Sequence, residues 1–306
     1  MDLRRTLLHL LTFAVLAPAA GAQPVIEGRQ ELALDRPESW AMSYMTAATL
    51  FHGLGNDSDL KPWDMAFTME LAHIPRIDEE DTAVGFNGSK LEDLNKSPVF
   101  GRGRLGIGLP GSFLLELAYT PPISIDGARP DGFYGAALGR SLWRGDRWRA
   151  GARLFAQSGR VRGDITCSRA TVAAGDDLTL NPFGCEAPSD DEAELDYVGL
   201  ELNVAYRAGR WEPFAAWSYT RVRPEVQVNA RTFGVIDRTR LVTSGVLRSG
   251  SAGLAFQSHP NLRFSFAVDY TPLDVVRGPG ATAESDDYLS ARLTATWRPG
   301  FLNRSD

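Results

Sequence analysis

The sequence predicts an all-β fold, namely a single antiparallel transmembrane β-barrel of about ten strands. Three features support this prediction: an export signal at the N-terminus, segments in which apolar and polar residues alternate, and short turns that alternate with long polar loops. After the export signal, no apolar stretch approaches the roughly 18 residues that a membrane-spanning helix needs. The 30 Gly, 7 Trp, 8 Tyr and 15 Phe therefore favour β-structure over a helical membrane protein.

The first 22 residues have the three-part layout of a secretory signal peptide. Met1 to Arg5 is a short basic start, Thr6 to Ala17 is apolar, and Ala20-Gly21-Ala22 is a small-residue cleavage site. Cleavage after residue 22 leaves 284 of the 306 residues and moves the formal net charge from −6 to −7. This negative charge argues against a nucleic-acid partner, because proteins neutralise nucleic-acid phosphates with Lys and Arg.

From Trp63 onward, successive segments alternate with a period of two residues, which places one set of side chains on each face of a strand. The segment 262–270 is the clearest case. One face carries Leu262, Phe264, Phe266, Val268 and Tyr270, and the other carries Arg263, Ser265, Ala267 and Asp269. A soluble β-sandwich also alternates, so the connections must separate the two folds.

The connections between these segments are sorted by length. Very short turns at 110–111, 145–146, 208–209 and 260–261 alternate with long polar loops at 75–98, 122–131, 166–194, 229–238 and 271–286. Membrane barrels have this asymmetry, with tight turns on the periplasmic side and long loops outside. A sandwich has no reason to sort its loops, so the barrel is preferred to a soluble exported sandwich that binds glycans or proteins.

The barrel domain is predicted over residues 63–298, with a C-terminal tail at 299–306. Its ten strands are expected near residues 63–74, 99–109, 112–121, 132–144, 148–165, 195–207, 211–228, 239–258, 262–270 and 287–298. An even number returns both ends of the barrel to the periplasm.

Residues 23–62 are expected to form an N-terminal periplasmic segment that packs at or in the periplasmic mouth. Over 37–52 a helix would place Trp40, Tyr44, Ala47 and Phe51 on one face. A strand in the same place would make the count eleven, so the helix preserves the even number. A twelve-strand barrel, with a further strand from 24–35, is the alternative.

The aromatic residues form two predicted girdles, because Trp and Tyr prefer the levels where hydrocarbon meets the lipid headgroups. The short-turn end would carry Trp63, Trp143, Trp148, Trp211 and Trp297. The long-loop end would carry Tyr119, Tyr134, Tyr197, Tyr270 and Tyr288.

The inward faces carry charges of both signs. The candidate lumen residues are Glu70, Arg102, Arg104, Glu116, Arg149, Arg153, Glu201, Arg263, Asp269 and Arg292. A barrel of about ten strands lies near the size that side chains fill, so a lumen closed by ion pairs is the preferred interpretation. A charged constriction that passes small polar solutes is the alternative.

Cys167 and Cys185 are the two cysteines, and both lie in the longest outer loop. An exported protein enters an oxidising compartment, so the pair predicts a disulfide. Closing this loop would stabilise the fold by roughly 3 kcal/mol. A metal site there lacks nearby His ligands. The acidic runs at 78–81, 190–196 and 284–287 are expected to be solvated loop surface without the spacing of a calcium loop.

Three His follow the signal and are the candidates for a catalytic group: His52, His73 and His259. His73 alone lies at the outer end of a predicted strand, but it shares the face of Met69 and Leu71, which predicts that it faces lipid. The glycine-rich run 101–106 lacks the helix that a phosphate loop needs. We therefore expect no covalent catalysis and no cofactor, with a lipid-modifying enzyme based on His73 as the remaining alternative.

Taken together, the signal peptide, the alternating strands, the loop asymmetry and the girdles cover almost the whole chain. In these features the sequence resembles Gram-negative outer-membrane β-barrel proteins, and no motif indicates a particular subfamily. The resemblance implies outer-membrane localisation and contact with outer-membrane lipid and lipopolysaccharide. It also implies that barrel-insertion machinery handles the chain during assembly.

Overall fold

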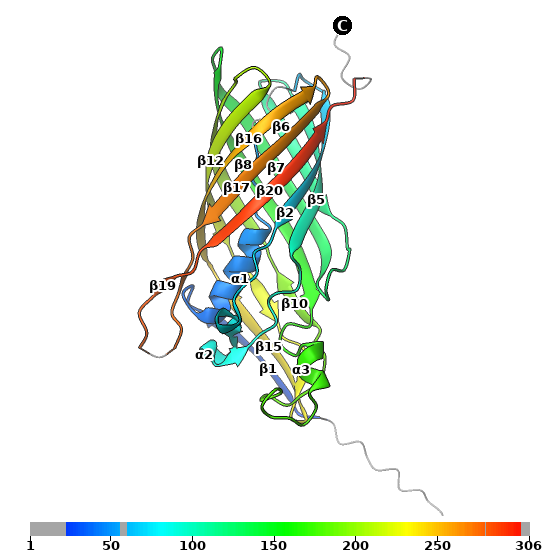
Figure 1. Cartoon of the computed structure of the whole chain (residues 1–306), viewed down its shortest axis with the longest axis vertical. Helices are drawn as coiled ribbons and strands as arrows, with labels where there is room; N and C mark the ends of the chain where they lie inside the picture. The colour runs from blue at the N-terminus through cyan, green and yellow to red at the C-terminus, as the bar shows by residue number, and fades with distance from the viewer. Residues whose placement is uncertain (1–22, 56–59, 279, 301–306) are drawn as a thin grey trace, which may run out of the picture.

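The computed structural model describes residues 23–55, 60–278 and 280–300. The expected signal peptide and most of the expected C-terminal tail lie outside the described residues. In Figure 1 the chain forms one barrel, with the short turns at the top and the long loops at the bottom.

Ten antiparallel strands close the barrel. They are β2 (Met65–His73), β5 (Val99–Leu109), β6 (Phe113–Thr120), β7 (Arg129–Arg144), β8 (Trp148–Gly163), β11 (Tyr197–Tyr206), β12 (Trp211–Val222), β16 (Gly245–His259), β17 (Leu262–Thr271) and β20 (Tyr288–Trp297). Each pairs with the next, and β20 pairs with β2 through Phe67 opposite Trp297. The predicted fold class and strand number are confirmed, and the twelve-strand alternative is wrong.

Parts of the predicted loops, and the long-loop ends of the predicted strands 211–228 and 239–258, are β-structure that extends the sheet beyond the barrel. Its strands are β9 (Cys185–Ala187), β10 (Asp191–Glu194), β13 (Glu225–Gln227), β14 (Ala230–Thr232) and β15 (Val235–Thr243). We call these five strands, with β1 (Val25–Leu32), the outer extension. The strand predicted over 239–258 is in fact β15 and β16, with a break at Ser244. The alternation continues through both strands, so no change of period marks where the extension ends and the barrel begins.

The N-terminal segment enters the barrel from the long-loop end, which corrects its expected place at the periplasmic mouth. Strand β1 pairs with β15 in parallel over eight residue pairs. Helix α1 (Pro37–Ala48) follows and lies at the long-loop end of the barrel, with its C-terminal end toward the lumen. The expected helix is present but ends four residues earlier than predicted. Every residue of α1 except Met45 is buried, and a helix that is buried on all sides requires a packed interior rather than a surface groove.

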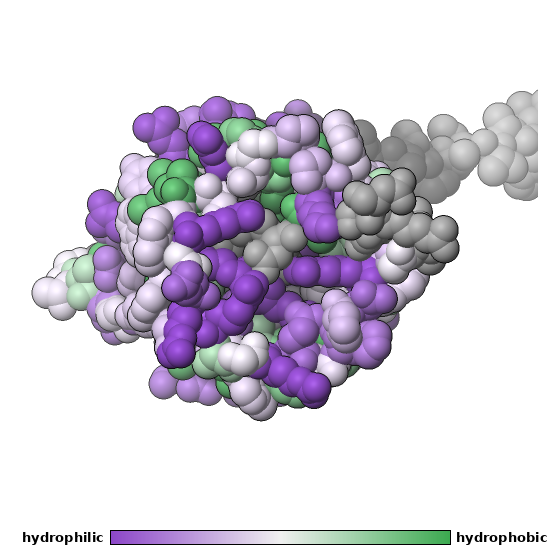
Figure 2. Space-filling model, turned by 90° about the horizontal axis from the view of Figure 1, so that it is seen from above, coloured by the Kyte–Doolittle hydropathy of each residue, from purple (hydrophilic) through white to green (hydrophobic). Residues whose placement is uncertain are grey.

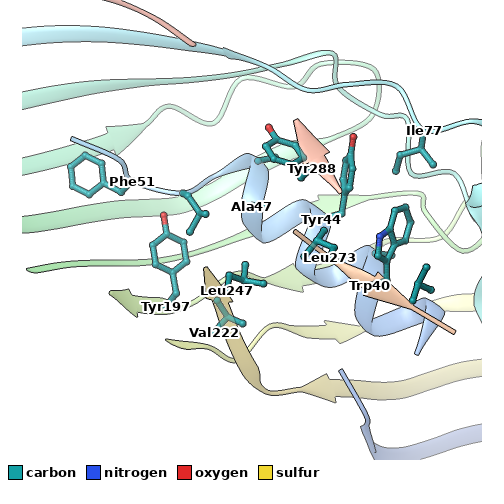
Figure 3. Close-up of a cluster of buried hydrophobic side chains, with 14 of the residues drawn as sticks. Trp40, Tyr44, Ala47, Phe51, Ile77, Tyr197, Val222, Leu247, Leu273 and Tyr288 are labelled. Carbon is teal, nitrogen blue, oxygen red and sulfur yellow. The ribbon is translucent and has the colours of Figure 1, made fainter. Parts of the chain in front are cut away.

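An apolar cluster surrounds α1, as Figure 3 shows. Trp40, Tyr44 and Ala47 of the helix meet residues from the barrel strands, from the connection between β2 and β5, and from the connection between β17 and β20. These partners include Ile77, Tyr197, Val222, Leu247, Leu273 and Tyr288. The cluster closes the long-loop half of the lumen.

The remaining elements are short and lie in the connections. They are η1 (Glu79–Thr82), β3 (Ala83–Val84), α2 (Gly85–Gly88), β4 (Lys90–Leu91), α3 (Arg169–Ala173), β18 (Asp274–Val275) and β19 (Glu284–Ser285). Among the described residues, no helix is both long and apolar enough to cross a membrane.

The outer wall exposes the apolar face of each strand, and eight of the ten predicted girdle residues are exposed on it. Tyr197 and Tyr288 are buried, so their assignment to the girdle is wrong. The alternation explains this, since Val198 and Leu289 face outward and their neighbours must face inward. A residue at the end of a strand belongs to a girdle only when it also lies on the outward face of that strand.

Candidate functional site: the occupied lumen

The ten charged residues named from the alternation all point into the barrel and are buried. Their exposed fractions lie between 1% and 7% for Glu70, Arg102, Arg104, Glu116, Arg149, Arg153, Glu201, Arg263, Asp269 and Arg292. Charges at this depth require partners, because an isolated buried charge costs several kcal/mol. The structure supplies these partners from two sources: opposing carboxylates and the backbone of the N-terminal segment.

The chain beyond α1 crosses the lumen in an irregular conformation over residues 49–53. Arginines from two strands, β5 and β20, donate to its carbonyl oxygens. Arg102 donates to Thr49 O at 2.7 Å, Arg104 to His52 O at 2.7 Å, and Arg292 to Leu50 O at 2.7 Å. These bonds replace the hydrogen bonds that a helix or strand would give to the same carbonyls.

The ring of Phe51 lies among three of the guanidinium groups. The guanidinium carbons of Arg153, Arg104 and Arg102 lie 4.3, 4.5 and 5.2 Å from the ring centroid. Arg153 also donates to the carbonyl oxygen of Phe51. Phe51 is fully buried, so these cation–π contacts are shielded from water and fix the segment at the centre of the barrel.

Glu70 is the carboxylate with the most arginine partners in this network. Its oxygens accept from Arg104 Nε at 2.7 Å and from Arg292 Nη1 at 2.6 Å, and Arg102 Nε lies 3.1 Å away. Three guanidinium groups that also hold the backbone of the N-terminal segment are thus neutralised in part by one side chain. Arg292 is further paired with Asp269.

The other carboxylates continue the network toward the short-turn end. Glu116 accepts from Arg153, and Glu201 accepts from the backbone N–H of Gly53 at 2.9 Å. A separate carboxylate, Glu212, binds two arginines, Arg149 at 3.0 Å and Arg263 at 2.9 Å. Glu212 was not predicted as a lumen residue, although it alternates with exposed Trp211 and its face could have been read from the sequence.

His52 lies between a carboxylate and a hydroxyl. Its Nδ1 is 3.1 Å from Asp269 Oδ1, and its Nε2 is 3.4 Å from Ser218 Oγ. This is the order of groups in a Ser-His-Asp nucleophilic site. However, each side chain is at most 2% exposed, so a substrate carbonyl cannot reach the Ser218 hydroxyl in this arrangement. His73, the catalytic candidate from the sequence, is exposed on the outer wall.

Little space is left beside the crossing segment. A cavity of about 20 Å³ lies among Gly53, Glu116, Arg153 and Asn203, which is room for about one water molecule. Seen from the short-turn end, hydrophilic side chains crowd the face of the molecule, as Figure 2 shows. At this level of the lumen, the crossing segment and its charged partners thus leave little free space among the described residues.

The predicted disulfide is confirmed in the outer extension. Cys167 and Cys185 are bonded, with their Cα atoms 5.7 Å apart, and both are buried. The segment that they close contacts the connection between β2 and β5 through Phe183, whose ring stacks on Phe86 at 5.4 Å between centroids.

One of the acidic runs is less solvated than expected. Asp191 is fully buried and accepts hydrogen bonds from Thr166 N at 2.7 Å, Asn229 N at 2.9 Å and Ser189 Oγ at 2.7 Å. It therefore holds the loop backbone together, a role that a charge run does not reveal. Within the described part of the chain, no group of three or more His, Cys, Asp or Glu could hold a metal ion.

The architecture defines the class of protein. A closed antiparallel barrel pairs its strands with one another around the wall, and this one turns an apolar face outward and buries its charges inside. The chain is an integral β-barrel of the outer membrane.

No family model and no curated protein matches this chain. Among solved structures, it is similar to the outer membrane protease OmpT from Escherichia coli, with 10% identity and a TM-score of 0.38 over 76% of this chain and 91% of that one. It is also similar to LpxR from Salmonella typhimurium, with 10% identity and a TM-score of 0.34 over 76% and 100% of the chains. A third is the toluene transporter TbuX from Ralstonia pickettii, with 8% identity and a TM-score of 0.33 over 79% and 90%. Scores of this size do not bear on the role of this chain.

Proposed function

We propose that this chain is a non-conducting outer-membrane barrel that serves a structural or surface-interaction role. Its own N-terminal segment closes the lumen, and its outer extension presents a disulfide-bonded surface beyond the wall. The observation that carries this proposal is the binding of residues 49–53 by Arg102, Arg104, Arg153 and Arg292. Each of these arginines is held in turn by a buried carboxylate, so the closure and the network support each other.

Conductance in planar bilayers tests the closure. The complete mature chain should give no steady steps, whereas a variant that lacks residues 24–53 should give them, because the arginines would then face water. A matched variant that lacks only 24–34 removes β1 but keeps α1 and the crossing segment, and it should remain silent. A change of gel mobility on boiling shows that each variant is folded.

Steady steps from the complete chain would contradict the proposal. If their ion selectivity also changed with Arg104→Ala, the small-solute channel would replace it. Arg104 is the appropriate probe because its guanidinium touches both Glu70 and the carbonyl of His52.

The position of the outer extension can be tested on intact cells. An epitope inserted after Gly175, in the segment that the disulfide closes, should be recognised by an antibody without permeabilisation. Recognition only after permeabilisation would place the long loops in the periplasm and remove the surface-interaction role.

We also propose that the barrel performs no covalent catalysis. The Ser218–His52–Asp269 arrangement is the observation that speaks for a hydrolase, and its burial is the observation against it. Purified protein should release no fatty acid from phospholipid vesicles. Release that disappears with Ser218→Ala but persists with the matched Ser249→Ala would establish the enzyme, and release that disappears with His73→Ala would place the reaction at the outer wall.

A further inference from the structure

A hollow of about 1130 Å³ joins the lumen side of α1 to the outer surface of the barrel. Inside the barrel, its lining includes Tyr44 and Met45 of α1 and Phe100 of β5. Outside, it includes Met69 and Leu71 of β2, which are exposed on the lipid-facing wall. The hollow is larger than the roughly 300–1,000 Å³ of ordinary small-molecule pockets because it continues along the outer wall.

The wall is interrupted where the hollow passes through it. The pairing of β5 with β6 ends at Gly103 opposite Tyr119, although β5 itself begins at Val99. The pairing of β6 with β7 ends at Thr120 opposite Phe133, although β7 begins at Arg129. The long-loop ends of β5 and β7 therefore have no strand between them, and we call this gap the notch.

Prolines explain why the ladder stops at the notch. Pro98 precedes β5, Pro121 and Pro122 follow β6, and Pro130 lies in the second position of β7. Proline has no backbone N–H and cannot donate to a neighbouring strand. Pro98, Pro121 and Pro130 line the hollow, so the residues that end the pairing also form its edge.

Small residues leave the outer wall open beside the notch. Gly101 and Gly103 of β5 face outward without a side chain, and Ala295 of β20 lies in the same groove. The groove continues between larger outward side chains such as Phe266 and Leu293. It thus runs along the surface that contacts the hydrocarbon of the membrane and leads to the notch.

We propose that the acyl chain of a bilayer lipid enters the barrel sideways through the notch and lies against α1. The outward groove beside Phe266 and Leu293 faces lipid hydrocarbon, and the notch begins at the level of Tyr119 and Tyr134, where hydrocarbon meets the head groups, so the acyl chain of a lipid lies next to this opening. The inward part offers an apolar surface formed by Met45, Phe100 and Leu195. The head group stays outside, because the inward surface is largely apolar and Lys96 in the lining is already paired with Asp93 and Asp164. This inference does not depend on whether the lumen conducts.

Photocrosslinking tests the path directly. The protein is placed in phosphatidylethanolamine vesicles that contain a phospholipid with a diazirine near the end of one acyl chain. After irradiation, labelled peptides should include Tyr44 and Met45 of α1 as well as the outward residues of β2 and β5. Tyr44 and Met45 line the inner part of the hollow, so labelling there requires a chain that has passed the notch. Labels confined to outward residues would overturn the proposal.

A substitution that fills the notch provides the second arm. Gly101→Phe should reduce labelling of α1 roughly tenfold, because a ring in the notch overlaps the path of the chain. A Cβ at Gly101 meets its nearest atoms at 3.5 and 3.9 Å, so the backbone accepts the side chain. Gly103→Phe, with nearest atoms at 3.9 and 4.0 Å, should act in the same way.

Gly250→Phe is the matched control. Gly250 lies on β16, where an added Cβ has no atom within 4 Å, and it does not line the hollow. Labelling of α1 should equal that of the unmodified protein, with the folded state of each variant verified by gel mobility. Unchanged labelling in both Gly101→Phe and Gly103→Phe, or an equal loss in Gly250→Phe, would reject the notch as the route.

Discussion

The two halves of the lumen are closed by different chemistry. Near the long loops, α1 fills the barrel and its surroundings are largely apolar. Toward the short turns, residues 49–53 cross a region of arginines and carboxylates. The difference follows from the backbone, because a helix satisfies its own N–H and C=O groups, whereas an irregular segment needs donors from outside.

This comparison explains why so many arginines point inward. A carbonyl in the centre of a barrel is out of reach of the strand ladder, and a guanidinium on a long side chain can span that distance and donate several hydrogen bonds at once. Each arginine then requires a carboxylate. The polar half is therefore a single interdependent set, while the apolar half is a sum of separate contacts.

The largest expected effect is that of Glu70→Ala. It leaves Arg102, Arg104 and Arg292 without their shared carboxylate, and removing one partner of a buried ion pair costs about 3–5 kcal/mol. In detergent micelles, urea should unfold the variant at a lower midpoint concentration than the unmodified protein. The free energy of unfolding should be lower by that amount. The adjacent Met69→Ala, which changes a side chain exposed on the outer wall, should change the midpoint little.

An equal shift for the two variants would show that the inward charges do not hold the lumen closed. Glu70→Gln separates charge from shape, because the amide keeps an acceptor but lacks the charge. We expect it to fall between the unmodified protein and Glu70→Ala.

A smaller effect is expected in the apolar half, for Tyr44→Phe. The Tyr44 hydroxyl donates to Pro75 O at 3.0 Å, and the ring packs edge-on against Tyr288. The variant loses one partly buried hydrogen bond and keeps the ring, so we expect a loss of about 1 kcal/mol in the free energy of unfolding from the same urea titration. Tyr119→Phe on the outer wall is the matched control. A loss of free energy of unfolding in Tyr44→Phe larger than that in Glu70→Ala would contradict the expected order of the two halves.

The strands of the barrel wall could be predicted from the sequence, because each strand has its own alternation with a period of two residues. The ten strands and the inward direction of Arg104 and Arg292 follow from local pattern alone. The helix over 37–48 was also predictable, since Pro37 begins it and its aromatic residues share a face.

What occupies the lumen could not be predicted from local pattern. The partners of Arg104 include a carbonyl at His52, and a backbone carbonyl has no signature in the sequence. The contact between His52 and Asp269 joins residues 217 positions apart. The parallel pairing of β1 with β15 joins residues 211 positions apart, and nothing in the segment 25–32 identifies its partner.

The last and smallest expected effect concerns the connection between β2 and β5, which covers α1 at the long-loop end. Glu92 lies there with both carboxylate oxygens 2.9 Å from Lys90 Nζ. Burial raises the pKa of Glu92 from 4.5 to about 8 against the opposing effect of Lys90, with a further contribution from the charges of Asp191 and Glu38. Between these two pKa values the folded connection holds a proton that the unfolded chain releases, so its stability decreases as the pH rises from about 5 to about 8 and changes no further above that.

Hydrogen exchange, corrected for the intrinsic rate at each pH, measures this effect as local opening of residues 77–98. Protection should fall across that pH range in the unmodified protein and stay level in Glu92→Gln, which cannot ionise. Peptides from β11 in the barrel wall serve as the internal reference and should show no such slope in either protein. An identical slope in Glu92→Gln would assign the pH dependence to another group and leave the cover of α1 independent of this carboxyl.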